Sequence, residues 1–339
     1  MKLVERPTFG NGEQYSTIAG MKELTCRDDG RLFLRNEYDR IFQAVGWRSL
    51  EDVFAKLPKH EVLRSRNYPG GWDNLRLTFS SDPSLEAKPI VAFMKRHRPS
   101  DDVTAPAGLI EAAAVGLCQR ANVPCMRVLA AGAGPAKSDG TGVPYESVFI
   151  SEAMGDGNDA FHRACRLLGD CSSHECDAEL RIILKAVVET VARMHAAELF
   201  HGDCHLNHFM LDQGNADGAM IARVIDLQGI RQATGARATY LWLKDMGQLR
   251  NSLLKLGLYR RYRQWWYQTY AETRKRLDGA QFGGRWARYL VGTRGNMRII
   301  KGMLSDATRF RFHQVRQQTG LLFPRNGFGW QAGVWHDPK

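Results

Sequence analysis

The chain has 339 residues, of which 44% are hydrophobic and 24% charged, and it carries a formal net charge of +11. That length is enough for two lobes around a sizeable core, and the composition is ordinary for a soluble globular protein. No apolar run reaches the length of a membrane span, no apolar leader follows Met1, and the seven cysteines show no disulfide framework, so a cytoplasmic protein is expected.

The first part of the chain predicts a small lobe of strands and one long helix. Residues 1–58 show no strong periodicity, apart from a short amphipathic helix within 47–55 that has Ser49 as its N-cap. The elements predicted next are strands over 61–66, 74–79 and 89–95, a helix over 107–121, and strands over 128–130 and 147–151 on either side of a Gly-rich loop at 132–142. This order indicates an α+β lobe.

After Glu152 the pattern becomes mainly helical. Apolar residues at helical spacing predict an amphipathic helix over about 178–197. We expect its apolar face to pack in the hydrophobic core rather than to line a cofactor site. A polar loop at 201–208 and two short strands around an Asn-Ala-Asp-Gly turn follow it. The segment 239–316 is mainly helical and rich in Trp, Tyr and Arg.

Several possible metal ligands lie close together ahead of the long helix. They are His162, Cys165, Cys171, His174 and Cys176. Their spacing does not match the paired CxxC arrangement of a structural zinc site. A polar loop with reduced thiols is therefore favoured over a metal site.

Basic residues are concentrated in the second half of the chain. Between Arg250 and Arg325 there are 17 Lys and Arg and three acidic residues, a net charge of +14, whereas the rest of the chain carries −3. Such a segment attracts nucleic acid, anionic lipid headgroups, or a phosphorylated or carboxylated substrate, unless it is a solubilising surface. Charge alone does not choose among these.

Two aspartates carry the predicted chemistry. Asp203 lies in the polar loop after the long helix, and Asp226 ends a short strand 23 residues later. Phosphoryl transfer needs one carboxylate to receive or orient the proton of the attacking hydroxyl, and a second to hold Mg²⁺ against the nucleotide phosphates. We therefore predict Asp203 as the catalytic carboxylate and Asp226 as the metal ligand of an ATP-dependent phosphotransferase.

The first lobe supplies the remaining parts of a nucleotide site. Lys95 closes a strand, where its ammonium can reach the α- and β-phosphates, and Glu111 on the next helix can pair with it. Glu152 and Met154 follow the last strand of the lobe, where backbone groups can hold adenine. A surface salt bridge is the usual meaning of a lone Lys–Glu pair, but here both residues fall where a kinase needs them.

These motifs resemble the lipopolysaccharide kinase family, the heptose and Kdo kinases, which is a bacterial branch of the protein-kinase-like superfamily. The resemblance covers about residues 60–250. It is carried by residues 91–96, Glu111 with 122–124, 201–209, 224–227 and Lys244-Asp245.

The resemblance implies a two-lobed α+β fold with a small, mainly β N-lobe containing one key helix and a larger helical C-lobe. It implies ATP and Mg²⁺ as cofactors, and transfer to a sugar hydroxyl of the lipopolysaccharide inner core. It gives Asp203, Asp226, Lys95 and Glu111 the roles assigned above, and Asp245 is similar to the helix aspartate that braces the catalytic loop. The expected domains are an extension of unassigned role at 1–58, the N-lobe at 59–152, the C-lobe at 153–325 and a tail at 326–339.

The sequence departs from the usual kinase pattern at two places. Five residues after the catalytic aspartate, most kinases have an asparagine that binds metal. Here that position is His208, with Asn207 beside it, and the lipopolysaccharide kinases that this chain resembles also have histidine there. His208 is the metal ligand we predict, and Asn207 is the alternative. There is also no GxGxxG, so Gly70 and Gly71 form the candidate phosphate-covering turn.

The leading functional hypothesis is a kinase for a heptose or Kdo hydroxyl on a lipid-linked, anionic sugar acceptor. It would act in the cytoplasm with peripheral contact to the inner face of the inner membrane. A small-molecule or protein kinase of the same fold is one alternative. Another is an inactive pseudokinase that binds a membrane or partner, although such a scaffold would need none of Lys95, Glu111, Asp203 and Asp226. A nucleic-acid partner is not expected, because only charge favours it.

Overall fold

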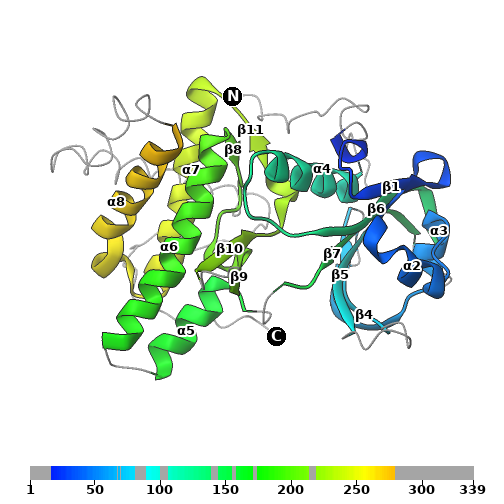
Figure 1. Cartoon of the computed structure of the whole chain (residues 1–339), viewed down its shortest axis with the longest axis horizontal. Coiled ribbons are helices and arrows are strands. Elements are labelled where there is room, and N and C mark those ends of the chain that lie inside the picture. The colour runs from blue at the N-terminus through cyan, green and yellow to red at the C-terminus, as the bar shows by residue number, and fades with distance from the viewer. Residues whose placement is uncertain are drawn as a thin grey trace. The chain divides into compact units, whose positions relative to one another are not determined.

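The computed structural model describes residues 17–66, 68, 70–80, 89–99, 106–138, 144–154, 158–170, 174–213 and 219–278 (Figure 1). The chain forms two compact units. The first combines residues up to 160 with 208–232, and the second combines 161–207 with the residues from 233 onward.

A seven-stranded antiparallel sheet forms the frame of the first unit. Its order is β1-β2-β6-β7-β5-β4-β3. The strands are β1 (Leu24–Arg27), β2 (Leu32–Arg35), β3 (Lys59–Ser65), β4 (Trp72–Phe79), β5 (Ile90–His97), β6 (Val128–Ser138) and β7 (Pro144–Glu152).

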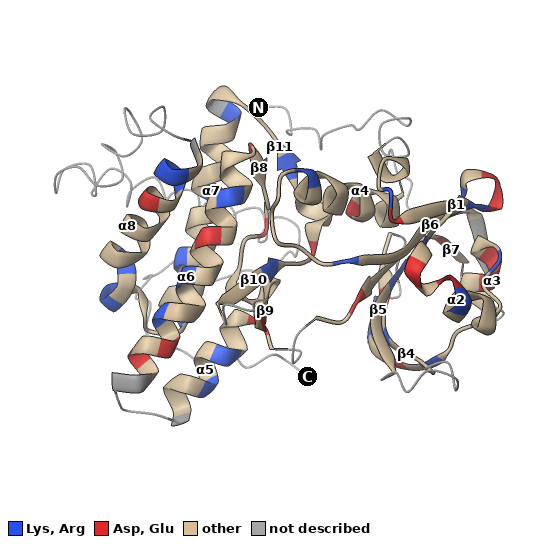
Figure 2. Ribbon diagram, in the orientation of Figure 1, with Lys and Arg blue, Asp and Glu red and all other residues tan. Residues whose placement is uncertain are grey.

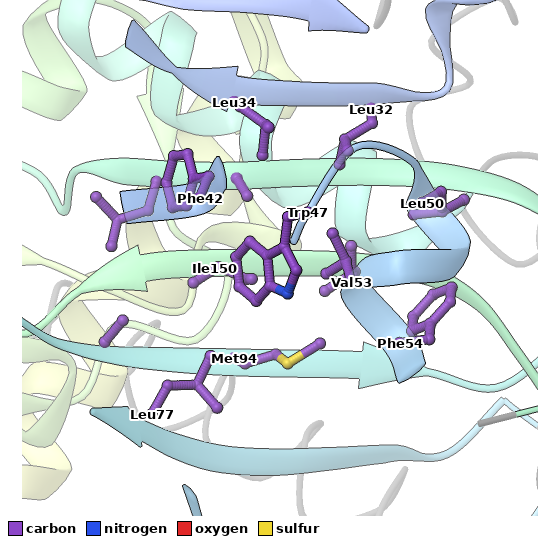
Figure 3. Packing of buried hydrophobic residues seen from close by; sticks show 14 of the residues in the cluster. Leu32, Leu34, Phe42, Trp47, Leu50, Val53, Phe54, Leu77, Met94 and Ile150 are labelled. Carbon is purple, nitrogen blue, oxygen red and sulfur yellow. The ribbon is translucent and has the colours of Figure 1, made fainter. Parts of the chain in front are cut away.

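The stretch before residue 58 completes the hydrophobic core of this sheet. It contains α2 (Asp39–Val45) and α3 (Leu50–Ala55), and α3 begins at the predicted cap, Ser49, in a capping box with Asp52. Figure 3 shows Trp47 among side chains from α2, α3 and the sheet, and Trp47 has no exposed surface. Two strands of this stretch, β1 and β2, join the sheet beside β6, so its described residues, from 17 onward, share the sheet and core of the N-lobe.

Helix α4 (Ala107–Arg120) also belongs to the first unit, where it contacts β5, β6 and β7. The strands β9 (Phe209–Gln213) and β10 (Met220–Val224) form an antiparallel hairpin. A short 3-10 turn, η4 (Leu227–Gly229), follows the hairpin and contacts α4. This contact brings the segment after β10 to the helix that bears Glu111.

The second unit is mainly helical. Its elements are α5 (Ala160–Asp170), α6 (His174–Ala196), the short strand β8 (Leu199–Phe200), α7 (Gly235–Lys255) and α8 (Tyr259–Asp278). Helices α6 and α8 pack along each other. Within the described ranges, no helix combines the length and the apolar composition that a bilayer crossing requires.

The predicted Gly-rich loop at 132–142 is wrong over most of its length, because β6 continues to Ser138. The reason is steric. A Cβ on Gly132 would come within 2.7 Å of the Arg31 carbonyl and 2.8 Å of the Leu50 side chain, so the glycine lets this strand lie close to its neighbours.

The predicted polar loop around residues 162–176 is also wrong. Its described part is helical, in α5 and at the start of α6. Of the thiols expected to be reduced there, Cys165 is free, whereas Cys176 is disulfide-bonded. The residues after 278 lie outside the described ranges, and with them most of the predicted basic segment and the tail.

Candidate active site

A lysine between two carboxylates lies at the centre of the first unit. Lys95 in β5 donates from Nζ to Oε1 and Oε2 of Glu111 at 2.9 and 3.2 Å, and to Oδ1 of Asp226 at 2.8 Å. The Glu111 side chain is fully buried, while those of Lys95 and Asp226 are 18% and 29% exposed. The predicted ion pair between strand and helix is present, and its cation retains some accessible surface.

The charge on this lysine is stabilised by its neighbours. Burial opposes the charge, but the carboxylates of Glu111 and Asp226 outweigh it, so the pKa of Lys95 is raised. Burial raises the pKa of Glu111, against the effects of the ammonium and of the Leu227 N–H. With Nζ within 3.2 Å of both Glu111 oxygens, the geometry is that of an ionised pair. Lys95 therefore presents a fixed positive charge.

His97 is on the same face of β5 as Lys95, two residues further along. It is 3% exposed, and its Nε2 has no hydrogen-bond partner among the described residues. Burial, followed by repulsion from Lys95, lowers the pKa of His97 to about 3. The imidazole is therefore uncharged near neutral pH.

Asp226 follows β10 in a left-handed backbone conformation, with φ of 58°. Such a conformation is uncommon for residues other than glycine and occurs often at functional sites. Nε2 of His208 lies 3.8 Å from Oδ2 of Asp226, and the Ile225 N–H donates to the His208 carbonyl at 2.9 Å. The two predicted metal ligands therefore face each other.

These donors fit a magnesium ion in part. Mg²⁺ in nucleotide enzymes is held by one or two carboxylates together with the substrate phosphates, and Asp226 offers such a carboxylate. Imidazole nitrogen suits transition metals better than Mg²⁺, so the donor set favours Asp226 over His208 as the Mg²⁺ ligand.

The predicted adenine-binding segment is tied to the N-terminal stretch. The Oε1 atom of Glu152 accepts from the Tyr38 hydroxyl at 3.0 Å, and Oε2 is 2.8 Å from Nη1 of Arg127. Burial and the Glu152 carboxylate raise the pKa of Tyr38 to about 12, so its hydroxyl stays a donor. The backbone N–H of Ala153 is used by the Val91 carbonyl, and Met154 is half-buried beyond it.

Asp203 lies in the second unit, in a loop held by helix α7. Gln248 donates from Nε2 to Oδ1 of Asp203 at 3.2 Å and accepts from the Cys204 N–H at 2.7 Å. Asp245 is fully buried and accepts from the N–H groups of His201 and Gly202 at 2.7 and 2.8 Å. Asp245 thus braces the loop, as the resemblance implies.

Sequence reasoning missed two further residues that hold the loop. They are Gln248 and Ser252, whose Oγ accepts from the Leu206 N–H at 3.2 Å. Together with Asp245 they occupy positions i, i+3 and i+7 of α7, which is one stripe of a helix. The predicted brace, Asp245, marks the face of α7 that meets the loop. The helical spacing of Gln248 and Ser252 from Asp245 could therefore have identified them in the sequence.

A buried histidine supports the same brace from behind. His195 in α6 contacts Oδ2 of Asp245 at 3.3 Å and the Tyr270 hydroxyl at 2.9 Å. Burial lowers the pKa of His195 despite the adjacent carboxylate. Asp245 is therefore held by a hydrogen-bonded chain from α6 and α8.

The basic helix α8 buries most of its aromatic residues. Trp266, Tyr267 and Tyr270 are at most 3% exposed, and Trp265 is partly exposed. Trp265 lines a groove on α6 and α8 together with Lys185, Thr269, Glu272, Thr273, Lys275 and Arg276. In Figure 2, positions of Lys and Arg, coloured blue, follow one another along the ribbons of both helices.

A sequence profile of the lipopolysaccharide kinase (Kdo/WaaP) family matches residues 104–270. This segment belongs to the lipopolysaccharide kinase family. The match contains Glu111, Asp203, His208 and Asp226 and begins after Lys95. The predicted resemblance is thereby confirmed, and membership of a kinase family supports a phosphotransferase.

The solved structure of WaaP in complex with acyl carrier protein is similar to this chain, with a TM-score of 0.50 and 22% identity over 80% of this chain and 99% of that one. It supports the predicted α+β fold, with an antiparallel-sheet N-lobe and a helical C-lobe. A crystal structure of the BubR1 kinase domain matches with a TM-score of 0.34 and 14% identity, over 51% of this chain and 47% of that one. Comparison with curated proteins finds no match.

Proposed function

We propose that this protein is an ATP-dependent kinase that phosphorylates a heptose or Kdo hydroxyl of the lipopolysaccharide inner core. The observation that carries the proposal is the placement of Lys95 between Glu111 and Asp226, within 3.2 Å of both carboxylates. An ammonium fixed in this way is what a nucleotide triphosphate needs for positioning. A scaffold that binds no nucleotide has no use for it.

Each residue then has a defined task. Lys95 binds the α- and β-phosphates, and Glu111 fixes its direction from α4. Asp226 holds Mg²⁺, which neutralises charge on the phosphates when bound. Asp203 accepts or orients the proton of the attacking sugar hydroxyl, and its partner Gln248 sets the direction of that carboxylate.

The anionic acceptor is supported by the charge of the second unit. Arg260, Arg263 and Lys275 of α8 are exposed, and Lys275 borders the groove that also contains Trp265 and Lys185. Cationic side chains beside a partly exposed aromatic ring suit a phosphorylated or carboxylated sugar. Such a surface also suits peripheral contact with the anionic inner face of the inner membrane, so the working site we propose is that face in the cytoplasm.

The decisive experiment is ATP turnover against a panel of truncated core lipopolysaccharides, with mass measurement of the product. We expect one added phosphate on an inner-core heptose or Kdo. Asp203→Asn should fold and bind nucleotide but lose several orders of magnitude in rate, and Asp226→Asn should weaken Mg²⁺-dependent nucleotide binding. Near-wild-type activity of either purified variant would remove that assignment.

The same assay separates the alternatives. Turnover of a small molecule or protein, but of no core lipopolysaccharide, would favour a kinase of another specificity. Mg²⁺-ATP binding without turnover on any acceptor would favour the pseudokinase. Because the similar WaaP structure contains acyl carrier protein, each reaction should be run with and without that protein.

A further inference from the structure

The hydroxyl of Tyr270 joins three helices of the second unit. Tyr270 lies in α8 and is 1% exposed. Its oxygen is 2.9 Å from Nε1 of Trp242 in α7 and 2.9 Å from Nδ1 of His195 in α6. The third partner is Nη1 of Arg274 in α8 itself, at 3.3 Å. Helix α8 packs against both α6 and α7 (Figure 1), so one phenol oxygen connects side chains of all three helices.

The direction of each hydrogen bond at this oxygen follows from what its partners can do. An indole N–H and a guanidinium are donors and have no acceptor atom. Trp242 and Arg274 must therefore donate to the two lone pairs of the Tyr270 oxygen. The hydroxyl then donates its own proton to Nδ1 of His195. These three partners use both lone pairs and the proton of the hydroxyl.

The other side of the imidazole leads independently to the same tautomer. Oδ2 of Asp245 lies 3.3 Å from Nε2 of His195 and also accepts the His201 N–H at 2.7 Å. A carboxylate accepts and does not donate, so Nε2 must carry a proton. Burial lowers the pKa of His195, which leaves a single proton on the ring. Both sides therefore require the tautomer that has its hydrogen on Nε2 and a lone pair on Nδ1.

The plane of this imidazole is fixed by its surroundings. The ring is stacked on Phe200, with 5.1 Å between the ring centroids and 29° between the planes. Phe200 ends β8, and the next residue is His201, whose N–H donates to Asp245. The hydrogen bonds thus run in one direction. They lead from donors on α7 and α8, through the hydroxyl and the imidazole, to the carboxylate that holds the loop at 201–208.

We propose that Tyr270 is a positioning residue for the loop that bears Asp203, which it reaches through His195. By donating to Nδ1, the hydroxyl keeps the Nε2 proton of the imidazole directed at Asp245. That carboxylate binds the Gly202 N–H, and Asp203 is the next residue. The inference rests on the proposed function, in which Asp203 serves the attacking hydroxyl. Proton transfer depends on the position of the accepting carboxylate, so Tyr270 should affect kcat rather than nucleotide affinity.

Two tyrosines of α8 give a variant and its matched control. Tyr270→Phe keeps the buried ring and removes the hydroxyl, so Nδ1 of His195 loses its donor. Tyr262→Phe makes the same change at a residue of the same helix that has no exposed surface and whose hydroxyl donates to Asp177 in α6. Asp177 is near the start of α6, about 27 Å along the helix axis from His195. The control therefore removes a comparable hydrogen bond far from the loop.

The first test is steady-state turnover of Mg²⁺-ATP by the full chain, with the truncated core lipopolysaccharides as acceptors. For Tyr270→Phe we expect kcat to fall roughly threefold to tenfold, the factor for one hydrogen bond, with KM for ATP unchanged. Tyr262→Phe should keep the wild-type kcat, even where its urea unfolding midpoint falls as far as that of Tyr270→Phe. In a His195→Gln background, Tyr270→Phe should cause no further loss, because the hydroxyl acts through the imidazole.

The free protein gives two readings that do not depend on turnover. In the ¹⁵N spectrum of histidine-labelled protein, assigned by comparison with His195→Gln, wild-type His195 should carry its proton on Nε2. In Tyr270→Phe, the Nδ1 resonance should move toward that of an imidazole nitrogen that accepts no hydrogen bond. The amides of His201 and Gly202, which donate to Asp245, should exchange with solvent faster in Tyr270→Phe than in the wild type or in Tyr262→Phe.

The outcomes separate this role from the proposed function. A proton on Nδ1 of wild-type His195, unchanged exchange of the two loop amides in Tyr270→Phe, or an equal fall of kcat in Tyr262→Phe would overturn the role of Tyr270. A wild-type chain that transfers phosphate to no acceptor would overturn the proposed function. In that case the spectrum and the amide exchange still decide whether Tyr270 positions the loop.

Discussion

The buried histidine of β5 makes the stability of the first unit depend on pH. In the folded chain His97 has a pKa of about 3, against an ordinary value of 6.5. As the pH falls below 6.5, the unfolded chain takes up a proton at this site and the folded chain does not. The free energy of unfolding therefore decreases as the pH falls, until the folded pKa is reached.

The size of the effect follows from the two pKa values. Between about pH 7.5 and about pH 5, the linkage at this one site removes about 2 kcal/mol from the free energy of unfolding. His97→Gln cannot take up the proton, so its stability should fall by about 2 kcal/mol less than that of the wild type over the same interval. Other groups also titrate in this pH interval, but they are common to the wild type and the variant. The difference between the two changes in unfolding free energy therefore isolates His97.

The assay is urea unfolding of both chains at the two pH values, in buffer containing EDTA so that bound metal does not contribute. His60→Gln serves as the control, because it removes an exposed histidine from β3, the edge strand of the same sheet. That variant should follow the wild type. Parallel pH dependence of the wild type and His97→Gln would refute the reasoning.

Three further predictions concern the supports around the site. Asp245→Asn leaves one of the two backbone N–H groups at His201 and Gly202 without its acceptor, so thermal unfolding should show a loss of about 1–3 kcal/mol. Trp47→Ala should destabilise the first unit by about 3–5 kcal/mol in urea, because a fully buried indole is removed from the core. Tyr38→Phe removes the hydroxyl that donates to Glu152, so steady-state kinetics should show the KM for ATP raised roughly twofold to tenfold with kcat unchanged. Equal changes in KM and kcat would contradict a role at the predicted adenine-binding segment.

The site elements that sequence reasoning predicted lie in strongly patterned segments. The ion pair of Lys95 and Glu111 followed from a strand and a helix whose periodicities are clear, and both were found within about two residues of their expected bounds. The position of Asp226 was predicted from the end of the second of two short strands. The contact of Asp245 with the loop was predicted from the family resemblance.

What sequence reasoning missed depends on packing rather than on local pattern. All four residues of β2 are buried, so the strand shows no alternation to recognise. The glycines of β6 indicated a loop because nothing local reveals the approach of Arg31 and Leu50 to Gly132. Asp73, Arg96 and Arg98 have the composition of a solvated surface, and only their register across β4 and β5 brings them together.

The contribution of α2 and α3 to the N-lobe core has a practical consequence for dissecting the protein. A fragment cut to residues 104–270, where the family match lies, would lose Lys95 and five of the seven sheet strands. A fragment starting at residue 59 would keep Lys95, Glu111, Asp203 and Asp226 but uncover the side chains of Leu75, Leu77 and Met94, which share one core cluster with Trp47. Apolar surface of that kind promotes aggregation. Soluble expression of the first unit therefore requires a starting point upstream of β1.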